Sequence, residues 1–253
     1  MPRKILARGP ILGQTFVVSR NILPVVLALG FSLAACSASP SDPDSSEAAD
    51  LTAAPEIGLI SDLDDTLIPK ATVDLSKPPV PGIAALFDTL EHRKSGKDGD
   101  VYYVTARTPA RVADVPAYLA TNGVPAGPIE TGTSGAPFIA IPEKEKDIEK
   151  ILAATGTQRF VLFGDSTHVD GFVQQNILAK HPDRVIAGII LKATPTVAPA
   201  EVKGLHLVNS YAEAAAVLYG LGTITKTEAR AVMKAAQDQG LAITTAEMNA
   251  LLD

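Results

Sequence analysis

Two aspartates, Asp62 and Asp64, lie two residues apart directly after a short apolar segment, and they are the residues most suited to chemistry in this chain. The apolar segment, residues 57–60, is typical of a buried strand. If that strand ends at Asp62, both carboxylates stand at its carboxyl end, where open α/β sheets bind their ligands. One carboxylate can then act as a nucleophile or hold a metal, while the other transfers a proton. This division of roles suits phosphoryl transfer.

The same stretch is also compatible with two simpler interpretations. Asp and Thr are common in solvated turns and helix caps, so residues 62–66 on their own could form a turn. A calcium loop of the EF-hand type needs Gly at its sixth position and Glu at its twelfth. Counted from Asp62, these positions hold Leu67 and Val73, which argues against a calcium loop. The choice between a turn and a catalytic site depends on whether partner motifs follow.

Three further groups of polar residues do follow, each at the end or start of an expected element. They are Thr105, the pair Lys144 and Lys146, and the pair Asp165 and Asp170. Carboxylates are the hard oxygen ligands that Mg²⁺ prefers, and a hydroxyl and an ammonium group can hold phosphoryl oxygens. Because several carboxylates at one sheet edge would repel one another, the pattern predicts a divalent cation between them.

The elements that must position these residues alternate between strands and helices from about residue 56, which favours βα units and a mostly parallel sheet. The expected strands are 57–61, 101–105, 160–163 and 185–191, with weaker ones at 205–208 and near Ile129. The expected helices are 81–91, 109–121, 143–154, 169–180, 211–219, 226–239 and 245–252. Two capping boxes, Thr225-x-x-Glu228 and Thr244-x-x-Glu247, mark the last two helices. The predicted fold class is therefore α/β, a three-layer Rossmann-like sheet with a small C-terminal helical appendage at 216–253.

The four motifs, in this order, resemble those of the haloacid dehalogenase superfamily. The matching residues are Asp62-x-Asp64-x-Thr66 for the first motif, Thr105 for the second, Lys146 or Lys144 for the third, and Gly164-Asp165-Ser166-x-x-x-Asp170 for the fourth. The resemblance implies that Asp62 forms an aspartyl-phosphate and that Asp64 protonates the leaving group and then activates water. It also implies a phosphatase rather than a dehalogenase, because the second acid is present.

The same resemblance assigns the remaining residues. Thr105 and Lys146 would hold the phosphoryl group, and Lys146 is favoured over Lys144 because the apolar helical pattern begins just after it. Mg²⁺ would be held by Asp62, by Asp64 through its backbone carbonyl, and by Asp165, with Asp170 in support. His168 lies inside the fourth motif and is expected to have only a local role at a helix start.

A closer resemblance is to the phosphatidate phosphatase catalytic domain of the actin-patch type. It is carried by residues 79–86, 164–166 and 181–186 and covers about 56–191, although Thr105 stands where many relatives have Ser. It implies a HAD-like phosphatase domain over 56–215. The gaps 67–100 and 106–143 leave no room for a sizeable cap, so the open site would admit phosphatidate or another membrane-borne phosphomonoester. The alternatives are a periplasmic phosphatase of small soluble phosphomonoesters and a non-catalytic lipoprotein with this fold.

The first 35 residues have the order of a secretory signal, with four basic residues, then an apolar run at 22–31, then small residues. Leu33-Ala34-Ala35-Cys36 resembles a bacterial lipobox, which implies a lipid on Cys36; an ordinary signal peptide with a chance cysteine is the alternative. Residues 36–55 are expected to form a flexible tether. By resemblance to sorting rules, Ser37 favours an anchor in the outer membrane, facing the periplasm.

Charge and cysteine content exclude several other classes of function. The formal net charge of −6 becomes −10 without residues 1–35, and such an acidic chain argues against nonspecific binding to nucleic acids. Cys36 is the single cysteine, so there is no disulfide within the chain and no cysteine metal site. The remaining residues, 36–253, are enough for one α/β domain with a full core. The expected partners are a phosphomonoester and, through the lipid, a membrane.

Overall fold

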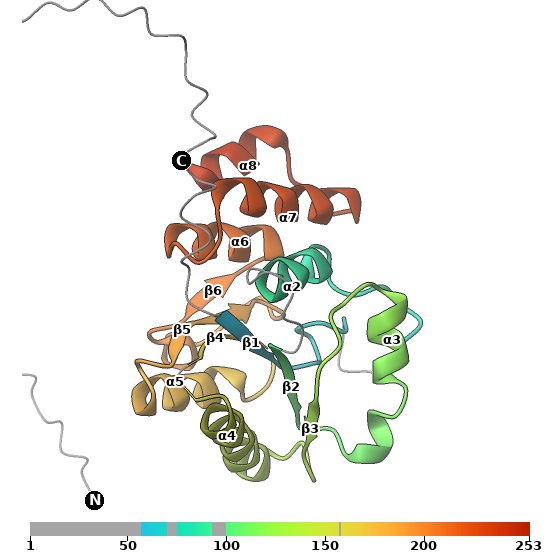
Figure 1. Ribbon diagram of the computed structural model, residues 1–253, viewed down its shortest axis with the longest axis vertical. Helices are drawn as coiled ribbons and strands as arrows, with labels where there is room; N and C mark the ends of the chain where they lie inside the picture. Colours follow the sequence, from blue (N-terminus) through green and yellow to red (C-terminus); the bar gives the residue numbers. More distant parts are fainter. Residues whose placement is uncertain (1–56, 70–74, 93–99, 157) are drawn as a thin grey trace, which may run out of the picture. The chain divides into compact units, whose positions relative to one another are not determined.

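Six parallel strands form the centre of the computed structural model, which describes residues 57–69, 75–92, 100–156 and 158–253 (Figure 1). The strands are β1 (Ile57–Ser61), β2 (Val101–Thr105), β3 (Ile129–Thr131), β4 (Arg159–Asp165), β5 (Val185–Leu191) and β6 (His206–Val208). Their order in the sheet is β3-β2-β1-β4-β5-β6, and each pairs in parallel with its neighbours. The order reverses between β1 and β4, so the carboxyl ends of these two strands flank the switch point of the sheet.

Helices cover both faces of this sheet, as the three-layer α/β prediction requires. They are α2 (Ile83–Glu91), α3 (Val115–Thr121), α4 (Pro137–Ala154), α5 (Asp170–Lys180), α6 (Tyr211–Gly220), α7 (Lys226–Asp238) and α8 (Thr245–Leu252), with 3-10 turns η3 (Pro109–Arg111) and η4 (Pro199–Val202). One apolar core contains buried side chains of α2, α3 and α6, and the other contains those of α4 and α5. The predicted fold class is confirmed.

The two cores follow from the alternation of side chains along the strands. In β1, Ile57 and Leu59 belong to the core on the α2 and α6 side, whereas Ile60 belongs to the core on the α4 and α5 side. In β4, Phe163 belongs to the core on the α2 and α6 side, and Leu162 belongs to the core on the α4 and α5 side. Because successive side chains of a strand point to opposite faces of the sheet, a strand that is apolar throughout must be covered by helices on both faces.

Two helices differ from the sequence-based expectation, and proline explains both. The helix expected at 109–121 is divided, because Pro116 in its interior would clash with the carbonyl four residues earlier; a new helix starts at Val115 instead, with this proline in its first turn. The helix expected at 143 begins at Pro137 and continues through Pro142. The carbonyl that loses its partner there belongs to Phe138, which is 80 % exposed and can be solvated.

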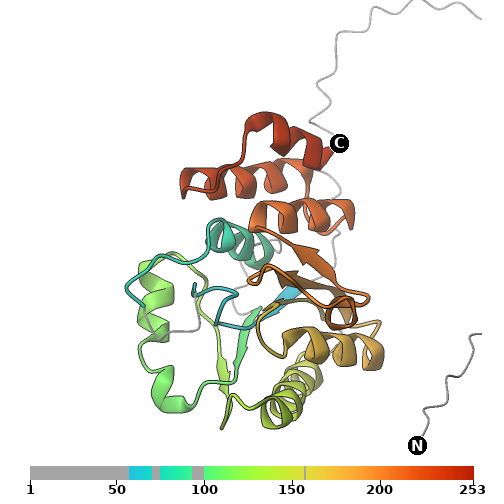
Figure 2. The same cartoon turned by 180° about the vertical axis from the view of Figure 1, so that it is seen from behind.

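The C-terminal helices α7 and α8 pack on α2 and α6 rather than on the sheet (Figures 1 and 2). Both predicted capping boxes are present, at Thr225 and Thr244. Met233 of α7 and Leu252 of α8 are buried in the same core as the sheet residues of that face. Gly82, which precedes α2 with a positive φ of 88°, donates its backbone N–H to Gln239 Oε1 at 2.8 Å. These helices therefore continue the core of the α/β domain.

No separate cap domain is found in the described parts of the segments that follow β1 and β2, which hold only α2, η3, α3 and β3. Within the described ranges, no helix is both long and apolar enough to cross a lipid bilayer. The predicted signal peptide (1–35), the tether (36–55) and the lipidation residue Cys36 lie outside the described residues.

Candidate active site

The site is formed where β1 and β4 lie side by side at the switch point of the sheet. Asp62 directly follows β1, and its backbone N–H donates to the Phe163 carbonyl of β4 at 3.0 Å. Asp165 is the last residue of β4. The register of the two strands, with Ser61 opposite Phe163, therefore brings two aspartates far apart in sequence to one sheet edge.

Three carboxylates meet at this edge. Asp62, Asp165 and Asp170 each offer an oxygen within 4.8 Å of the others, and their exposed fractions are only 6 %, 0 % and 4 %. Asp170 is the first residue of α5, and its Oδ2 accepts the backbone N–H of Asp165 at 3.1 Å. Gly164 makes room for this contact, because a Cβ there would lie 2.5 Å from Asp170 Cβ.

Lys144, on α4, neutralises part of this charge. Its ammonium group donates to Asp62 Oδ1 at 2.7 Å and to Asp170 Oδ1 at 2.6 Å, and the side chain is 5 % exposed. Lys146, the lysine favoured from the sequence, is exposed and has no hydrogen bond or ion pair among the described residues. The structure therefore places Lys144 in the site and corrects the choice of Lys146.

Asp62 keeps one oxygen free of protein partners. Its Oδ1 accepts from Lys144, whereas no hydrogen bond in the described part of the chain uses Oδ2. Asp170, in contrast, uses both oxygens, one for Lys144 and one for the backbone of Asp165. Oδ2 of Asp62 is thus the carboxylate oxygen best placed to react. The carboxylate of Asp170 is occupied by its hydrogen bonds to Lys144 and to the backbone of Asp165.

The second aspartate of the first motif, Asp64, is bound by an arginine that the sequence reasoning did not identify. Arg107 donates Nε to Asp64 Oδ2 at 2.8 Å and its Nη2 to Oδ1, in a two-point pair that is largely buried. Thr105 ends β2 as predicted, and its hydroxyl accepts the backbone N–H of Arg107 at 3.2 Å. Thr105 thus fixes the segment that carries Arg107.

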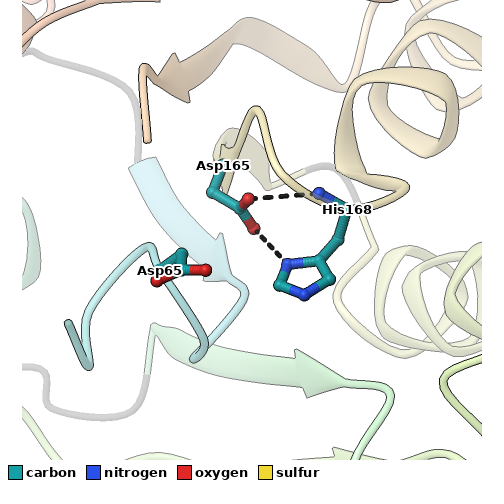
Figure 3. Close-up of side chains that lie close together, drawn as sticks. All are labelled: Asp65, Asp165 and His168. Atoms are coloured by element: carbon teal, nitrogen blue, oxygen red, sulfur yellow. Dashed lines mark hydrogen bonds and ion pairs between the residues drawn. The ribbon is translucent and has the colours of Figure 1, made fainter. Parts of the chain in front are cut away.

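His168 and Asp65 extend the cluster on the Asp165 side (Figure 3). His168 Nδ1 lies 3.2 Å from Asp165 Oδ2, and its backbone N–H donates to Asp165 Oδ1 at 3.2 Å. Asp65 offers an oxygen within 4.8 Å of both. Asp65 adopts a positive φ of 54°, a conformation that Asp tolerates better than most residues, in the turn after Asp64.

Burial and neighbouring charge shift the pKa values of these groups in different directions. Burial raises the pKa of Asp62 to about 8; Lys144 opposes this shift, and the nearby carboxylates add to it. Burial likewise raises the pKa of Asp170. A hydrogen bond to Asp165 raises the pKa of His168 to about 9. Burial alone would raise the pKa of Asp165, but its hydrogen bonds, first of all that from His168, hold it below the ordinary value.

These features fit a divalent cation. The donors are carboxylate oxygens, which are the ligands that Mg²⁺ and Ca²⁺ prefer. Burial and the neighbouring carboxylates raise the pKa of Asp62 although Lys144 opposes them, and an added cation would favour the ionised form of Asp62. Asp62, Asp165 and Asp170 are the residues whose oxygens lie close enough together to hold such an ion.

A pocket of about 400 Å³ opens onto this cluster. Asp62, Asp64, Lys144 and Arg107 line it, together with apolar residues of α4 and α5. Arg111 also lines it, is exposed, and has no side-chain hydrogen bond or ion pair among the described residues. The volume lies within the range of pockets that bind small molecules, roughly 300–1,000 Å³.

Comparisons with known proteins agree with this geometry in one respect. A family model for the catalytic domain of phosphatidate phosphatase APP1 matches residues 57–192, which include all the aspartates of the cluster. No match was found among curated proteins or among solved structures. The matched segment ends just after β5, so that β6 and the helices α6, α7 and α8 lie outside it.

Proposed function

Because this chain belongs to the family of phosphatidate phosphatase APP1 catalytic domains, we propose that it is a Mg²⁺-dependent phosphatase of phosphatidate or another membrane-borne phosphomonoester. Membership of the family indicates a phosphatase and implies a divalent metal. The observation that carries the finer proposal is the cluster of Asp62, Asp165 and Asp170 with Lys144 between two of them. Catalysis of phosphoryl transfer consists largely of such positioning and charge stabilisation.

In the proposed reaction, Oδ2 of Asp62 attacks the phosphorus atom of the substrate. A bond forms between this oxygen and phosphorus while the bond from phosphorus to the alcohol oxygen breaks, which leaves an aspartyl-phosphate of HAD type. Asp64 gives its proton to the departing alcohol oxygen. It then takes a proton from the water that attacks the intermediate, so that phosphate is released, Asp62 is again a carboxylate and Asp64 is again an acid.

The basic residues of the site prepare these steps. An ammonium group has three donors, and two of those of Lys144 are used by Asp62 and Asp170, which leaves one for a phosphoryl oxygen. Arg107 occupies both carboxylate oxygens of Asp64, so Arg107 must turn to the substrate before Asp64 can reach the departing oxygen. Guanidinium groups bind phosphate at two points, which makes this exchange of partners reasonable. When bound, Mg²⁺ would supply further positive charge to the phosphoryl oxygens. Asp62 and Asp165 would hold the ion, and the backbone carbonyl of Asp64 is the third proposed ligand.

Phosphate release from dioctanoyl phosphatidate tests the proposal. We expect release by the purified protein with Mg²⁺, loss of release with a chelator, and recovery when Mg²⁺ is restored. Asp62→Asn removes the nucleophile and should abolish release, whereas Asp183→Asn, in an exposed turn after α5, is the matched control. Undiminished release by Asp62→Asn would contradict the assignment of the nucleophile.

A phosphatase of small soluble phosphomonoesters is the second candidate. The size of the pocket is compatible with it, since about 400 Å³ holds a sugar phosphate as well as it holds a lipid headgroup. A panel of glycerol 3-phosphate, sugar phosphates and nucleotides beside phosphatidate separates the two candidates by the ratio of their kcat/KM values.

The location proposed for this activity is the outer membrane, facing the periplasm, with the protein anchored by lipid on Cys36. The lipobox-like residues 33–36 and Ser37 support it. Cells fed radiolabelled palmitate should label the protein but not the Cys36→Ser variant, and membrane fractionation should locate the labelled form. Equal labelling of both would contradict lipidation at Cys36.

A further inference from the structure

The pocket beside Asp62 has an ionic part and an apolar part. The ionic part contains the carboxylates, Lys144 and the two arginines. The apolar part is formed by the first turns of α4 and α5, which pack against each other, and includes Pro137, Ile141 and Phe172. An anionic group bound near Asp62 would therefore continue into apolar surroundings.

One exposed phenylalanine lies in the apolar part, and a second follows one of its residues in the sequence. Among the described residues, Phe138 is 80 % exposed and Phe172 is 43 % exposed, and no other phenylalanine in these ranges is an exposed large hydrophobic residue. Phe172 lines the pocket directly. Phe138 does not line the pocket, but it directly follows the lining residue Pro137 in the first turn of α4. Exposed aromatic side chains concentrated beside one site indicate a binding surface.

We propose that Phe138 and Phe172 bind the apolar part of the substrate, the ester-linked carbons next to the phosphate of phosphatidate, and so decide between lipid and soluble phosphomonoesters. The inference rests on the proposed function. Charge complementarity supports it, because Arg111, whose guanidinium group is exposed and has no ion pair among the described residues, lines the same pocket and suits the phosphate end of such an amphiphile. Phe138 and Phe172 are specificity-determining residues, distinct from those that carry out the reaction.

Paired kinetic measurements on two substrates with the same phosphate group test this assignment. The substrates are dioctanoyl phosphatidate below its micellar concentration and glycerol 3-phosphate, which lacks the acyl chains. For Phe172→Ala and Phe138→Ala, we expect the ratio of kcat/KM for the lipid to that for glycerol 3-phosphate to fall about tenfold each, the effect of losing one apolar side chain from a binding surface. Phe172→Leu, which remains apolar, should restore most of the ratio.

Leu221→Ala is the matched control, because Leu221 is 45 % exposed, close to the value for Phe172, but does not line the pocket. An unchanged ratio in both phenylalanine variants, or the same change in Leu221→Ala, would overturn the inference. If the wild-type protein hydrolyses neither substrate, the proposed function fails, and calorimetric binding of dioctanoyl phosphatidate with Mg²⁺ then decides the inference by itself. Weaker binding in Phe172→Ala supports it, and equal binding or none refutes it.

Discussion

At the scale of single residues, Lys144 determines whether the carboxylates of the site can be ionised together. It contacts Asp62 and Asp170 at hydrogen-bond distance, and all three side chains are almost completely buried. A buried charge without a partner is far more costly than one at the surface. The site thus depends on this lysine for its structure as well as for its proposed role in binding the phosphoryl group.

We expect Lys144→Ala to lower the free energy of unfolding by about 3 kcal/mol, because it leaves two buried carboxylates without their partner. Phosphate release should fall about a hundredfold, as when other electrostatic donors are removed from active sites. Urea unfolding and kinetics measure the two effects. Lys146→Ala, two residues away on an exposed position, should change neither. A larger loss of activity in Lys146→Ala than in Lys144→Ala would contradict the geometric assignment.

The sequence predicted the aspartates of the site better than its basic residues. Asp62 and Asp165 follow apolar strands, and parallel strands end at one edge, so their meeting could be foreseen. Lys146 was preferred because the apolar helical pattern begins just after it. Lys144, however, shares a buried face of α4 with Ile148, four residues later, and with Ile151, three residues after that. Nothing in the local pattern around Arg107 revealed its pair with Asp64, since their contact depends on how two loops approach.

At the scale of elements, α6 supports the loop that carries the first motif. Tyr211, the first residue of α6, is 1 % exposed, and its hydroxyl donates to the Thr66 carbonyl at 3.0 Å. Its ring also packs near those of Phe87 of α2 and Phe163 of β4. The helix α6 lies outside the segment matched by the family model. It nevertheless contacts the loop after β1 and the strand β4, the two elements that carry Asp62 and Asp165.

We expect Tyr211→Phe to lower the free energy of unfolding by about 1–3 kcal/mol, the cost of leaving a buried carbonyl without its donor. Because that carbonyl belongs to the loop after Asp62 and Asp64, kcat for phosphate release should fall more than KM rises. Tyr219→Phe is the control, since its hydroxyl on the same helix has no hydrogen bond among the described residues. Unchanged kcat in Tyr211→Phe would show that α6 supports the fold but not the geometry of the loop.

Element boundaries could be predicted where one local signal dominates. The two capping boxes place the starts of α7 and α8 correctly, because each satisfies backbone donors through its own side chains. The prolines gave less reliable signals. Pro142 lies inside α4 and Pro116 divides the helix expected at 109–121, and which of these occurs depends on solvation and packing that sequence spacing does not contain.

At the scale of the whole molecule, the structural unit is longer than the matched catalytic domain. The sheet gains β6 after residue 192, and the core on the α2 side is closed by α6, α7 and α8. All the described residues from 57 to 253 belong to one compact unit. The C-terminal helices α7 and α8, for which the sequence suggested no chemistry, thus cover α2 and α6 and extend the core on that side of the sheet.

Substitution of Met233 of α7 tests whether this unit unfolds as one. Met233 is fully buried, so Met233→Ala should lower the free energy of unfolding by about 2–5 kcal/mol through lost burial and a new cavity. If the core is continuous, urea should abolish phosphate release and helical circular dichroism in the same transition, shifted to lower urea for the variant. Lys234→Ala, exposed on the same helix, should leave the midpoint unchanged. Loss of helical signal at a urea concentration where Met233→Ala still releases phosphate at its full rate would show instead that α7 and α8 unfold independently of the catalytic domain.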